Sequence, residues 1–309
     1  MLNYFNYCFA AFVITKDRPD LLISTVQKLL NQTLPPSFIL VIDNGTQDLT
    51  FEKIKQLNDE RVSHHSIGYN AGPAGGAYWG MKLLFERGFD WVLWVDDDDP
   101  PKFENLFEQM FQIVSDNDTS SLGMVGAVGE RFDYKKAKIL RFKDEELKGY
   151  LEAHTISGNM FPLVSKRVLE KGIHPDKSLF FGFEELDFGL ALKRAGFSIM
   201  ISGELHFMHR ELADRLNLHK NLYFKRNENS IWREYYGVRN LLYILIYKEL
   251  NLIGAIICFF RNIIKSVVVF KFGFIYGIKM SSLILRGLLD GLLGRMGMRI
   301  LPITKQLIK

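Results

Sequence analysis

The sequence predicts an α/β fold in which helices cover a mostly parallel sheet, followed by a C-terminal region of amphipathic helices. First, residues 9–130 alternate short apolar runs with helical patterns, as parallel strands joined by helices do. Second, four aspartates, Asp96 to Asp99, directly follow an apolar run over residues 91–95. Third, basic residues interrupt long apolar stretches after residue 230. We therefore expect one domain over residues 1–230 and a basic, membrane-associating helical region over residues 231–309.

Four strands are expected in the first part of the chain, each ending in polar or turn residues. A helix opened by a proline in its first turn should follow the first strand, from Pro19 to Leu30. Residues 43–45, Asp-Asn-Gly, are a turn signal after the second strand. A glycine-rich stretch over residues 68–76 and a helical pattern to Arg87 follow the third. The expected strands are Phe9–Thr15, Phe38–Asp43, Val62–Ser66 and residues 91–95.

The later elements are less regular. Residues 124–128 and 197–201 have the pattern of further strands, and residues 131–155 form a charged, irregular excursion that we expect over the crevice of the sheet. Glu184 should open a helix that runs to about Ala195, because acidic residues are favoured in a first helical turn.

Composition limits the class of protein. The 309 residues are 48% hydrophobic and 24% charged, which is ordinary for one large or two small globular domains. The net charge of +4 is uneven, because residues 241–309 carry +8. The two cysteines, Cys8 and Cys258, predict no disulfide framework and fit a reducing compartment. The N-terminus lacks a basic segment and a small-residue cleavage site, so we expect no signal peptide.

The aspartate run is the strongest candidate for a site. In an extended strand, Asp96 and Asp98 should point one way and Asp97 and Asp99 the other. Unit charges ~4 Å apart repel by roughly 4 kcal/mol near a protein surface, so the cluster should attract a cation. Oxygen-only ligands suit Mg²⁺ or Mn²⁺ completed by phosphate oxygens. The alternative is a solvated acidic turn.

Polar residues at other strand ends should meet the aspartates. The carboxyl ends of parallel strands share one edge of a sheet, where ligands bind, so Thr15, Asp43, Asn70 and Asp96 should line one crevice. The glycine-rich stretch lacks the spacing of a dinucleotide site or a P-loop. Gly72 and its neighbouring glycines either only permit a tight turn or present backbone N–H groups to a diphosphate.

Two further groups are candidates for chemistry. Glu184 and Glu185 either only stabilise the start of a helix or supply a general base. The phenylalanines around them would favour a raised carboxyl pKa. His209 is a candidate third metal ligand beside the aspartates, and His206 competes with it for that role. The alternative for each histidine is a structural role without a metal.

The region after residue 231 has basic residues interleaved with long aliphatic runs. Because these charges interrupt the runs, we expect no clean membrane span and instead predict helices on the surface of an anionic membrane. The alternative is that the apolar faces pack on the first domain or on another subunit. Because the charges are interleaved with long aliphatic runs rather than with stacking aromatics, lipid fits better than nucleic acid, and we expect no nucleic-acid partner.

Other cation-binding classes fit less well. An EF-hand loop would need an oxygen ligand and a glycine where this chain has Pro100 and Pro101. A nucleotidyltransferase, which remains the second enzyme class, should have a glycine-rich turn after the first strand, where residues 15–20 are Thr-Lys-Asp-Arg-Pro-Asp. A haloacid-dehalogenase-like phosphatase should have its aspartate nucleophile after the first strand.

The motifs together resemble the family-2 glycosyltransferases of the GT-A fold, whose Rossmann-like mostly parallel sheet binds nucleotide-diphospho-sugars. The likeness extends over about residues 9–245 and is greatest to bacterial galactofuranosyl- and rhamnosyltransferases. Its motifs lie at residues 12–19, 41–45, 70–76, 96–99, 184–187, 209, 232–240 and 286–295. No processive Gln-x-x-Arg-Trp element is visible, so the resemblance does not imply a processive polymerase.

The resemblance implies roles for individual residues. Glu185, or else its neighbour Glu184, matches the catalytic base. The remaining matches are a donor-nucleotide site at Thr15, Asp43, Asn70, Gly72, Asp96 and Asp97, and a Mn²⁺ or Mg²⁺ site at Asp96, Asp98 and His209.

The resemblance also implies an activity. It is inverting transfer of a sugar, galactofuranose before rhamnose, from a UDP- or dTDP-linked donor to a lipid-linked cell-surface glycan such as O-antigen polysaccharide. The expected location is cytoplasmic, on the inner face of the cell membrane, and a second copy of the chain is a further candidate partner. A non-catalytic, cation-binding membrane-surface protein is the remaining alternative.

Overall fold

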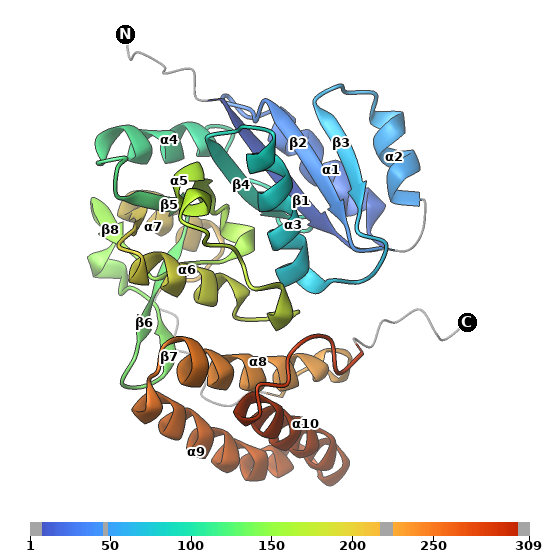
Figure 1. Cartoon of the computed structure of the whole chain (residues 1–309), viewed down its shortest axis with the longest axis vertical. Coiled ribbons are helices and arrows are strands. Elements are labelled where there is room, and N and C mark those ends of the chain that lie inside the picture. The colour runs from blue at the N-terminus through green and yellow to red at the C-terminus, as the bar shows by residue number, and fades with distance from the viewer. Residues whose placement is uncertain (1–7, 46–48, 217–224, 302–309) are drawn as a thin grey trace. The chain divides into compact units, whose positions relative to one another are not determined.

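The computed structural model describes residues 8–45, 49–216 and 225–301. The chain divides into two compact units (Figure 1). The first unit comprises residues 1–131, 141–176 and 185–217, and the second comprises residues 132–140, 177–184 and 218–309. The second unit therefore takes up two short segments that precede the domain boundary expected near residue 230.

The first unit is built on an eight-stranded sheet in the order β3-β2-β1-β4-β10-β5-β11-β8. Strands β1, β2, β3 and β4 are parallel to their neighbours within this group, as the sequence predicts. Their bounds agree with the expected ranges, with β4 one residue longer. The strands of this sheet are β1 Phe9–Thr15, β2 Phe38–Asp43, β3 Val62–Ser66, β4 Trp91–Asp96, β5 Leu122–Gly126, β8 Tyr150–Glu152, β10 Leu163–Ser165 and β11 Ser198–Ser202.

Two features of this sheet depart from the sequence prediction. The three-residue strand β10 inserts antiparallel between β4 and β5, and β8 adds antiparallel to the edge strand β11. The irregular excursion also contains β6 Gly129–Asp133 and β7 Lys138–Leu140, which form a three-stranded sheet with β9 Thr155–Ile156 in the order β7-β6-β9. Strands of two or three residues leave too short a hydrophobic period to be recognised in sequence.

Helices bury both faces of the large sheet. Alternate residues of β1 point to opposite faces, so Phe9, Ala11 and Val13 enter one core with α1 and α4. Phe12 and its alternate neighbours enter a second core with α3. Gly80 of α3 permits close packing, since a Cβ there would lie 2.3 Å from the Phe12 ring. The helices of this unit are α1 Pro19–Leu30, α2 Leu49–Leu57, α3 Gly72–Glu86, α4 Leu106–Asp116, α5 Lys166–Glu170, α6 Glu184–Arg194 (residue 184 belonging to the second unit) and α7 Gly203–Leu212, with 3₁₀ turns at Asp144–Glu146 and Gly158–Met160.

The second unit is helical. Arg239 is fully buried in α8 and donates hydrogen bonds to the carbonyl oxygens of Leu179 (2.8 Å) and Gly297 (2.6 Å). Tyr235 donates to Asp290 Oδ2 at 2.6 Å and so ties α8 to α10. The elements are α8 Trp232–Tyr243, a π-helical turn Ile244–Lys248, α9 Leu252–Val268 and α10 Phe274–Leu292, with 3₁₀ turns at Lys177–Leu179, Glu228–Ser230 and Val269–Phe272.

One stretch of the second unit bears on the expectation that charged residues leave no clean membrane span. Among the described residues, Leu252–Phe272 has the length and composition of a span, with a mean hydropathy of 2.0 and 33% of that window buried. Arg261 and Lys265 are the two charged residues within α9.

Candidate active site

The carboxyl ends of the parallel strands bring the predicted polar residues to one edge of the sheet. Thr15 is in register with Asp43, and Ile14 is in register with Asp96. Asn70 lies in the loop before α3, where its Oδ1 accepts a hydrogen bond from the Gly72 N–H at 3.1 Å. The carboxyl ends of β1, β2 and β4 therefore lie along one edge of the sheet (Figure 1).

Asp97, the residue after β4, is fully buried at the carboxyl end of the strand. Its Oδ2 accepts a hydrogen bond from Thr15 Oγ1 at 2.6 Å, and its carbonyl accepts one from Thr25 Oγ1 at 2.7 Å. Arg18 forms ion pairs with Asp97 and with Asp98, the latter at 2.5 Å. Burial raises the pKa of Asp97 to about 6, although Thr15 and Arg18 oppose that shift. A carboxylate held by a hydroxyl and a guanidinium is well placed to support a ligand at this edge.

The expected alternation of the four aspartates is wrong. Strand β4 ends at Asp96 and the chain then turns, so Asp97 and Asp98 both reach Arg18. Asp97 is fully buried, whereas the side chain of Asp98 is 48% exposed. Side chains alternate only while the backbone stays extended.

The carboxyl groups of Asp96 and Glu185 both have raised pKa values. Glu185 lies in the first turn of α6, and its Oε1 accepts a hydrogen bond from the Gly158 N–H at 3.2 Å. A Cβ at Gly158 would lie 3.1 Å from Asp96 Oδ1. Burial, then repulsion from Glu185, Asp98 and Asp97, raises the pKa of Asp96 to about 8. Burial also raises the pKa of Glu185. A raised carboxyl pKa is what a general base near neutral pH requires.

Glu184, the alternative base, is buried at 3% exposure. Glu185 accepts the hydrogen bond from the Gly158 N–H, and Gly158 lies beside Asp96.

The ends of β2 and β3 form a second polar group beside the first. His64 Nε2 lies 3.1 Å from Asp43 Oδ2, and the Gly45 N–H donates to Asp43 Oδ1 at 2.7 Å. Burial raises the pKa of Asp43, but these hydrogen bonds outweigh it and the pKa is lowered overall. Asp43 is therefore an ionised acceptor.

Asn44 connects this group to the glycine-rich loop. Its Nδ2 donates to the Gly72 carbonyl at 3.1 Å, and its Oδ1 accepts from the Ala71 N–H at 3.2 Å. Gly72 has φ +70°, a conformation that favours glycine. The loop is thereby fixed beside Asp43.

The predicted metal ligands do not form one group. Within residues 8–45, 49–216 and 225–301, no three or more His, Cys, Asp or Glu side chains are placed to hold a metal ion. Asp98 pairs with Arg18, whereas His209 packs edge-on against Phe103 at a ring-centroid distance of 5.1 Å. Burial lowers the pKa of His209 to about 4, and the charges of Asp99 and Lys102 shift it less, in opposite directions.

Part of this donor set nevertheless fits a divalent cation. Burial, followed by repulsion from neighbouring carboxylates, raises the pKa of Asp96 to about 8, and a nearby cation would offset both effects. His209 is neutral and its buried Nε2 has no hydrogen-bond partner among the described residues, as a metal-ligating nitrogen requires. His206, its competitor, is 1% exposed, and burial followed by Arg210 and Arg141 lowers its pKa to about 3.

Sequence reasoning missed four residues of the site. Arg18 is the counter-ion of two aspartates, and His64 is the partner of Asp43. Gly158 lies between Asp96 and Glu185, and Asn159 Nδ2 donates to Asp99 Oδ2 at 3.0 Å. A basic residue directly after the first strand could have suggested Arg18. Nothing in the pattern signals that residues 158–159 pack there.

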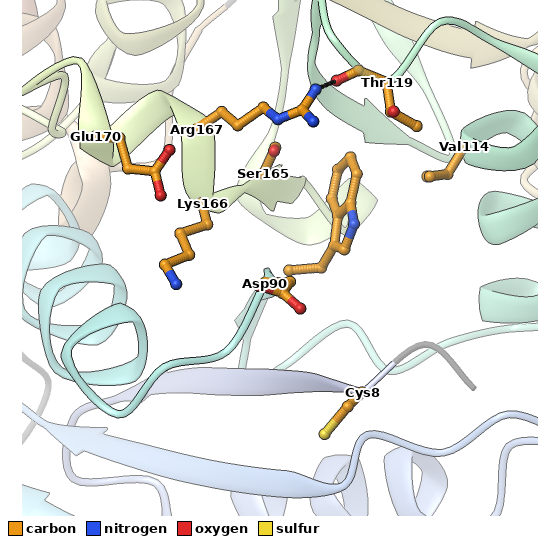
Figure 2. Close-up of a pocket in the computed structure, with 9 residues that line it drawn as sticks. Cys8, Asp90, Val114, Thr119, Ser165, Lys166, Arg167 and Glu170 are labelled. Carbon is orange, nitrogen blue, oxygen red and sulfur yellow. Dashed lines mark hydrogen bonds between the residues drawn. The ribbon is translucent and has the colours of Figure 1, made fainter. Parts of the chain in front are cut away.

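A cavity of about 420 Å³ lies at the opposite edge of the same sheet. Cys8 and Asp90, which line it, directly precede β1 and β4, so they lie at the amino ends of those strands. Figure 2 shows these side chains with those of Lys166, Arg167 and Glu170 around the opening, and with the hydrogen bond from Arg167 to the Thr119 carbonyl. This cavity is separate from the acidic site, because parallel strands present their two ends at opposite edges.

Comparison with known proteins agrees with this architecture. The chain is 34% identical over 90 residues to galactofuranosyltransferase GlfT1 of Mycobacterium tuberculosis, a match that spans 29% of this chain and 29% of the relative. The mannosyltransferase PcManGT of Pyrobaculum calidifontis, solved with GDP-Man and Mn²⁺, shares the fold with a TM-score of 0.55 and 10% identity, over 93% of this chain and 87% of that one. GalNAc-T7, solved with UDP, GalNAc and Mn²⁺, has a TM-score of 0.51 and 10% identity, over 63% of this chain and 42% of that one.

The family comparison covers more than half of the chain. Residues 10–172, which include β1 to β4 and the aspartate run, match the family described as Glycosyl transferase family 2. The α/β sheet, the C-terminal helical region and the solved neighbours agree with a GT-A architecture. The chain belongs to glycosyl transferase family 2.

Proposed function

We propose that this chain is an inverting, metal-dependent glycosyltransferase that moves a hexosyl group from a nucleotide-diphosphate sugar to a hydroxyl of a lipid-linked glycan. The observation that carries the proposal is the partly buried Glu185 carboxylate, which accepts a hydrogen bond from the Gly158 N–H beside Asp96 at the carboxyl edge of the sheet. Attack on an anomeric carbon needs a base near the acceptor hydroxyl, and this position offers one.

Glu185 would act as that base. Burial raises its pKa, so the carboxylate accepts a proton more readily than an exposed glutamate does. It would take the proton from the acceptor hydroxyl as the oxygen attacks the anomeric carbon from the face opposite to the leaving diphosphate. Displacement from that face inverts the anomeric configuration.

Residues of β1, β2 and the loop before α3 would hold the donor nucleotide. Asp43 is buried and ionised, so it can accept hydrogen bonds from ribose or base. Thr15, which is in register with Asp43, would contact the donor next to it, and its 2.6 Å hydrogen bond to Asp97 would hold it in place. Asn70 and Gly72 form the loop that closes this side.

Asp96 and Asp98 would hold a divalent cation, and His209 is the proposed third ligand. When bound, the ion would offset the negative charge that develops on the leaving nucleoside diphosphate. Arg18 holds Asp98 in the described structure, so Asp98 would have to exchange this partner. Mn²⁺ is the first candidate because two solved neighbours of the fold contain it.

Galactofuranose is the favoured sugar, and rhamnose is the second. The support is the 34% identity to a galactofuranosyltransferase, which extends over 90 residues only. UDP- and dTDP-linked sugars are therefore the donors to test first, with a cell-surface glycan of the O-antigen type as acceptor.

The proposed location is the cytoplasmic face of the cell membrane. Helices α9 and α10 expose a set of large apolar side chains: Ile253, Ile256, Phe260, Ile264, Val267, Phe274, Ile275 and Ile278. Exposed apolar residues on basic helices are typical of helices that lie in the interface of anionic lipid. Alternatively, a second copy of the chain covers these side chains. In that case the molecular mass measured in detergent-free solution should rise with protein concentration.

A donor screen tests the function directly. Purified protein with Mn²⁺ and a lipid-linked acceptor should release nucleoside diphosphate from one member of a panel of UDP- and dTDP-sugars. Release of pyrophosphate instead would identify a nucleotidyltransferase. If no nucleotide sugar reacts and none raises the unfolding temperature with Mn²⁺, the acidic site is a structural cation site, because a bound ligand must stabilise the folded state.

A further inference from the structure

The indole N–H of Trp94 is a buried hydrogen-bond donor without an acceptor. Trp94 lies in β4 and is 1% exposed, and its Nε1 has no hydrogen-bond partner among the residues that the structure describes. A buried N–H that stays unpaired destabilises the folded state, and the N–H of a buried tryptophan usually finds a partner. An apolar side chain would fill this part of the core without that cost. The unpaired donor therefore needs an explanation other than packing.

Trp94 and Asp96 project from the same face of β4. They are two residues apart, and side chains of an extended strand alternate between its faces. Trp94 enters the core that contains Phe12, and the centroids of the two rings are 6.1 Å apart. The indole therefore lies on the face of the sheet from which Asp96 reaches the candidate active site.

Gly158 is the point at which the two side chains approach each other. A Cβ at this glycine would lie 2.9 Å from Trp94 Nε1, 3.1 Å from Asp96 Oδ1 and 3.2 Å from Asp96 Oδ2. The segment after Gly158 is fixed to the strand, because the backbone N–H of Trp94 donates to the Pro162 carbonyl at 2.9 Å. Donor and acceptors thus surround one point that glycine leaves free of a side chain. Rotation of the Asp96 side chain can therefore bring a carboxylate oxygen to the indole N–H.

The Asp96 carboxylate has acceptor capacity to spare. Its neighbours Asp97 and Asp98 pair with Arg18, whereas neither Asp96 oxygen accepts a hydrogen bond in the described part of the chain. A carboxylate has two oxygens, so one can accept from the indole while the other faces a ligand. Hydrogen bonds to an ionised carboxylate are about twice as strong as those between neutral groups. An N–H held beside Asp96 is therefore suited to fix its orientation.

We propose that Trp94 is a positioning residue for Asp96. When the nucleotide and a divalent ion occupy the site, the indole N–H donates to one Asp96 oxygen and thereby directs the other oxygen to the ligand. The assignment rests on the proposed glycosyltransferase function, and it deepens that function by naming the buried partner of a proposed metal ligand. Trp94 acts through Asp96 and contacts neither the sugar nor the ion.

The indole N–H signals in NMR spectra test this hydrogen bond without turnover. The chain has four tryptophans, so ¹⁵N labelling of the indole nitrogens gives four signals, and Trp94→Phe identifies the signal of Trp94. Addition of UDP or dTDP with Mg²⁺, a diamagnetic ion, should move the Trp94 proton signal downfield, as formation of a hydrogen bond does. The signal of Trp91, which enters the core on the opposite face of β4, should stay in place.

Asp96→Ala locates the acceptor of this hydrogen bond. In this variant, with the nucleotide raised to a concentration that calorimetry shows to be saturating, the Trp94 signal should not move. An equal downfield shift in Asp96→Ala and in the unaltered chain would mean that the N–H donates to another acceptor. That result would overturn the assignment.

Nucleotide affinity separates positioning from packing. Trp94→Phe keeps an aromatic ring but removes the N–H, so it should weaken UDP binding with Mg²⁺ about tenfold, the loss expected for one hydrogen bond to a charged group. Binding of UDP in EDTA should change little. Trp91→Phe, the matched control at a residue that is 8% exposed, makes the same reduction in ring size on the other face of β4 and should alter neither affinity. Equal losses with Mg²⁺ and with EDTA, or in both variants, would assign Trp94 a packing role only.

The same titrations distinguish this inference from the proposed function. If neither UDP nor dTDP binds the unaltered chain, the inference and the proposed function both fail. If a nucleotide binds with Mg²⁺ and the Trp94 signal stays in place, the role of Trp94 alone is overturned. If the Trp94 signal moves as expected and no sugar is transferred in the donor screen, the proposed transfer alone fails.

Discussion

The backbone N–H of Gly158 donates a hydrogen bond to Glu185 Oε1 at 3.2 Å, and the same glycine lies against the Asp96 carboxylate. One residue without a side chain thus positions the proposed base beside the proposed metal ligand. The pKa values of both carboxyl groups are raised, primarily by burial. Carboxyl groups with raised pKa values therefore gather at this edge, as is common at catalytic sites.

Gly158→Ala should impair activity far more than stability. The new methyl group would lie 2.9 Å from Trp94 Nε1 and 3.1 Å from Asp96 Oδ1, so it would displace Asp96. A displacement of about 1 Å at a reacting centre costs on the order of 10²-fold in rate, whereas overpacking costs about 1–3 kcal/mol. Steady-state kinetics and urea unfolding measure the two effects. Gly80→Ala, which crowds the Phe12 ring instead, is the control for overpacking alone. A similar rate loss in both variants would contradict the positioning role.

Arg18→Gln should increase the stabilisation that Mn²⁺ gives the protein. Arg18 pairs with Asp98 at 2.5 Å and also with Asp97, so the guanidinium competes with any ion at this site. Without Mn²⁺ the free energy of unfolding of the variant should be lower by about 1 kcal/mol. The value is small because the Arg18 side chain is 44% exposed. Thermal unfolding with and without Mn²⁺ measures both quantities. A smaller Mn²⁺ shift in the variant than in the unaltered chain would show that Arg18 helps to bind the ion or its ligand.

Asp98→Ala should abolish the tightening of nucleotide binding by Mn²⁺, a loss of about tenfold or more. The carboxylate is 48% exposed and can turn from Arg18 to an ion without large rearrangement. Titration calorimetry with UDP or dTDP, in the presence and absence of Mn²⁺, makes the measurement. Asp118→Ala, an acidic residue outside the site, is the matched control. His209→Ala distinguishes the third ligand, because an unchanged Mn²⁺ effect there would assign His209 a purely structural role.

Glu234 should make the second unit sensitive to acid. Burial raises its pKa, but Lys265 and Arg226 outweigh burial and leave it below the ordinary value of 4.5. A lowered folded-state pKa adds stability above the unfolded-state pKa, and that stability is lost as pH falls through the folded value. Glu234→Gln should therefore cost about 1–3 kcal/mol at pH 7, and its difference from the unaltered chain should shrink below about pH 4. Urea unfolding at both pH values provides the test. A constant difference would mean that Glu234 stabilises by packing rather than by charge.

The parallel half of the sheet was predictable because its signals are local. Strands β1, β2 and β3 have the bounds that their apolar runs and turn residues predict. The placement of Thr15, Asp43 and Asp96 at one edge follows from parallel pairing alone. These features need no knowledge of how distant segments pack.

The details of the site depend on tertiary packing and were not predictable. The pairing of Arg18 with both Asp97 and Asp98 requires the turn that begins after Asp96, which an alternating pattern cannot reveal. Gly158 reaches Asp96 from 62 residues away in sequence, through a short 3₁₀ turn before the antiparallel strand β10. The position of His209 depends on the packing of α7 against Phe103. Short antiparallel segments carry too few residues to indicate a partner.

The central claim is that Glu185 is the base of a sugar transfer, and Glu185→Gln tests it most directly. With the donor identified by the screen, Mn²⁺ and acceptor, the rate of nucleoside diphosphate release should fall by about 10² to 10⁴-fold, the contribution of a general base. The affinities for donor and Mn²⁺, measured by calorimetry, should stay close to those of the unaltered chain. Retained turnover in Glu185→Gln would contradict the account and move the base elsewhere, with Glu184 as the next residue to replace.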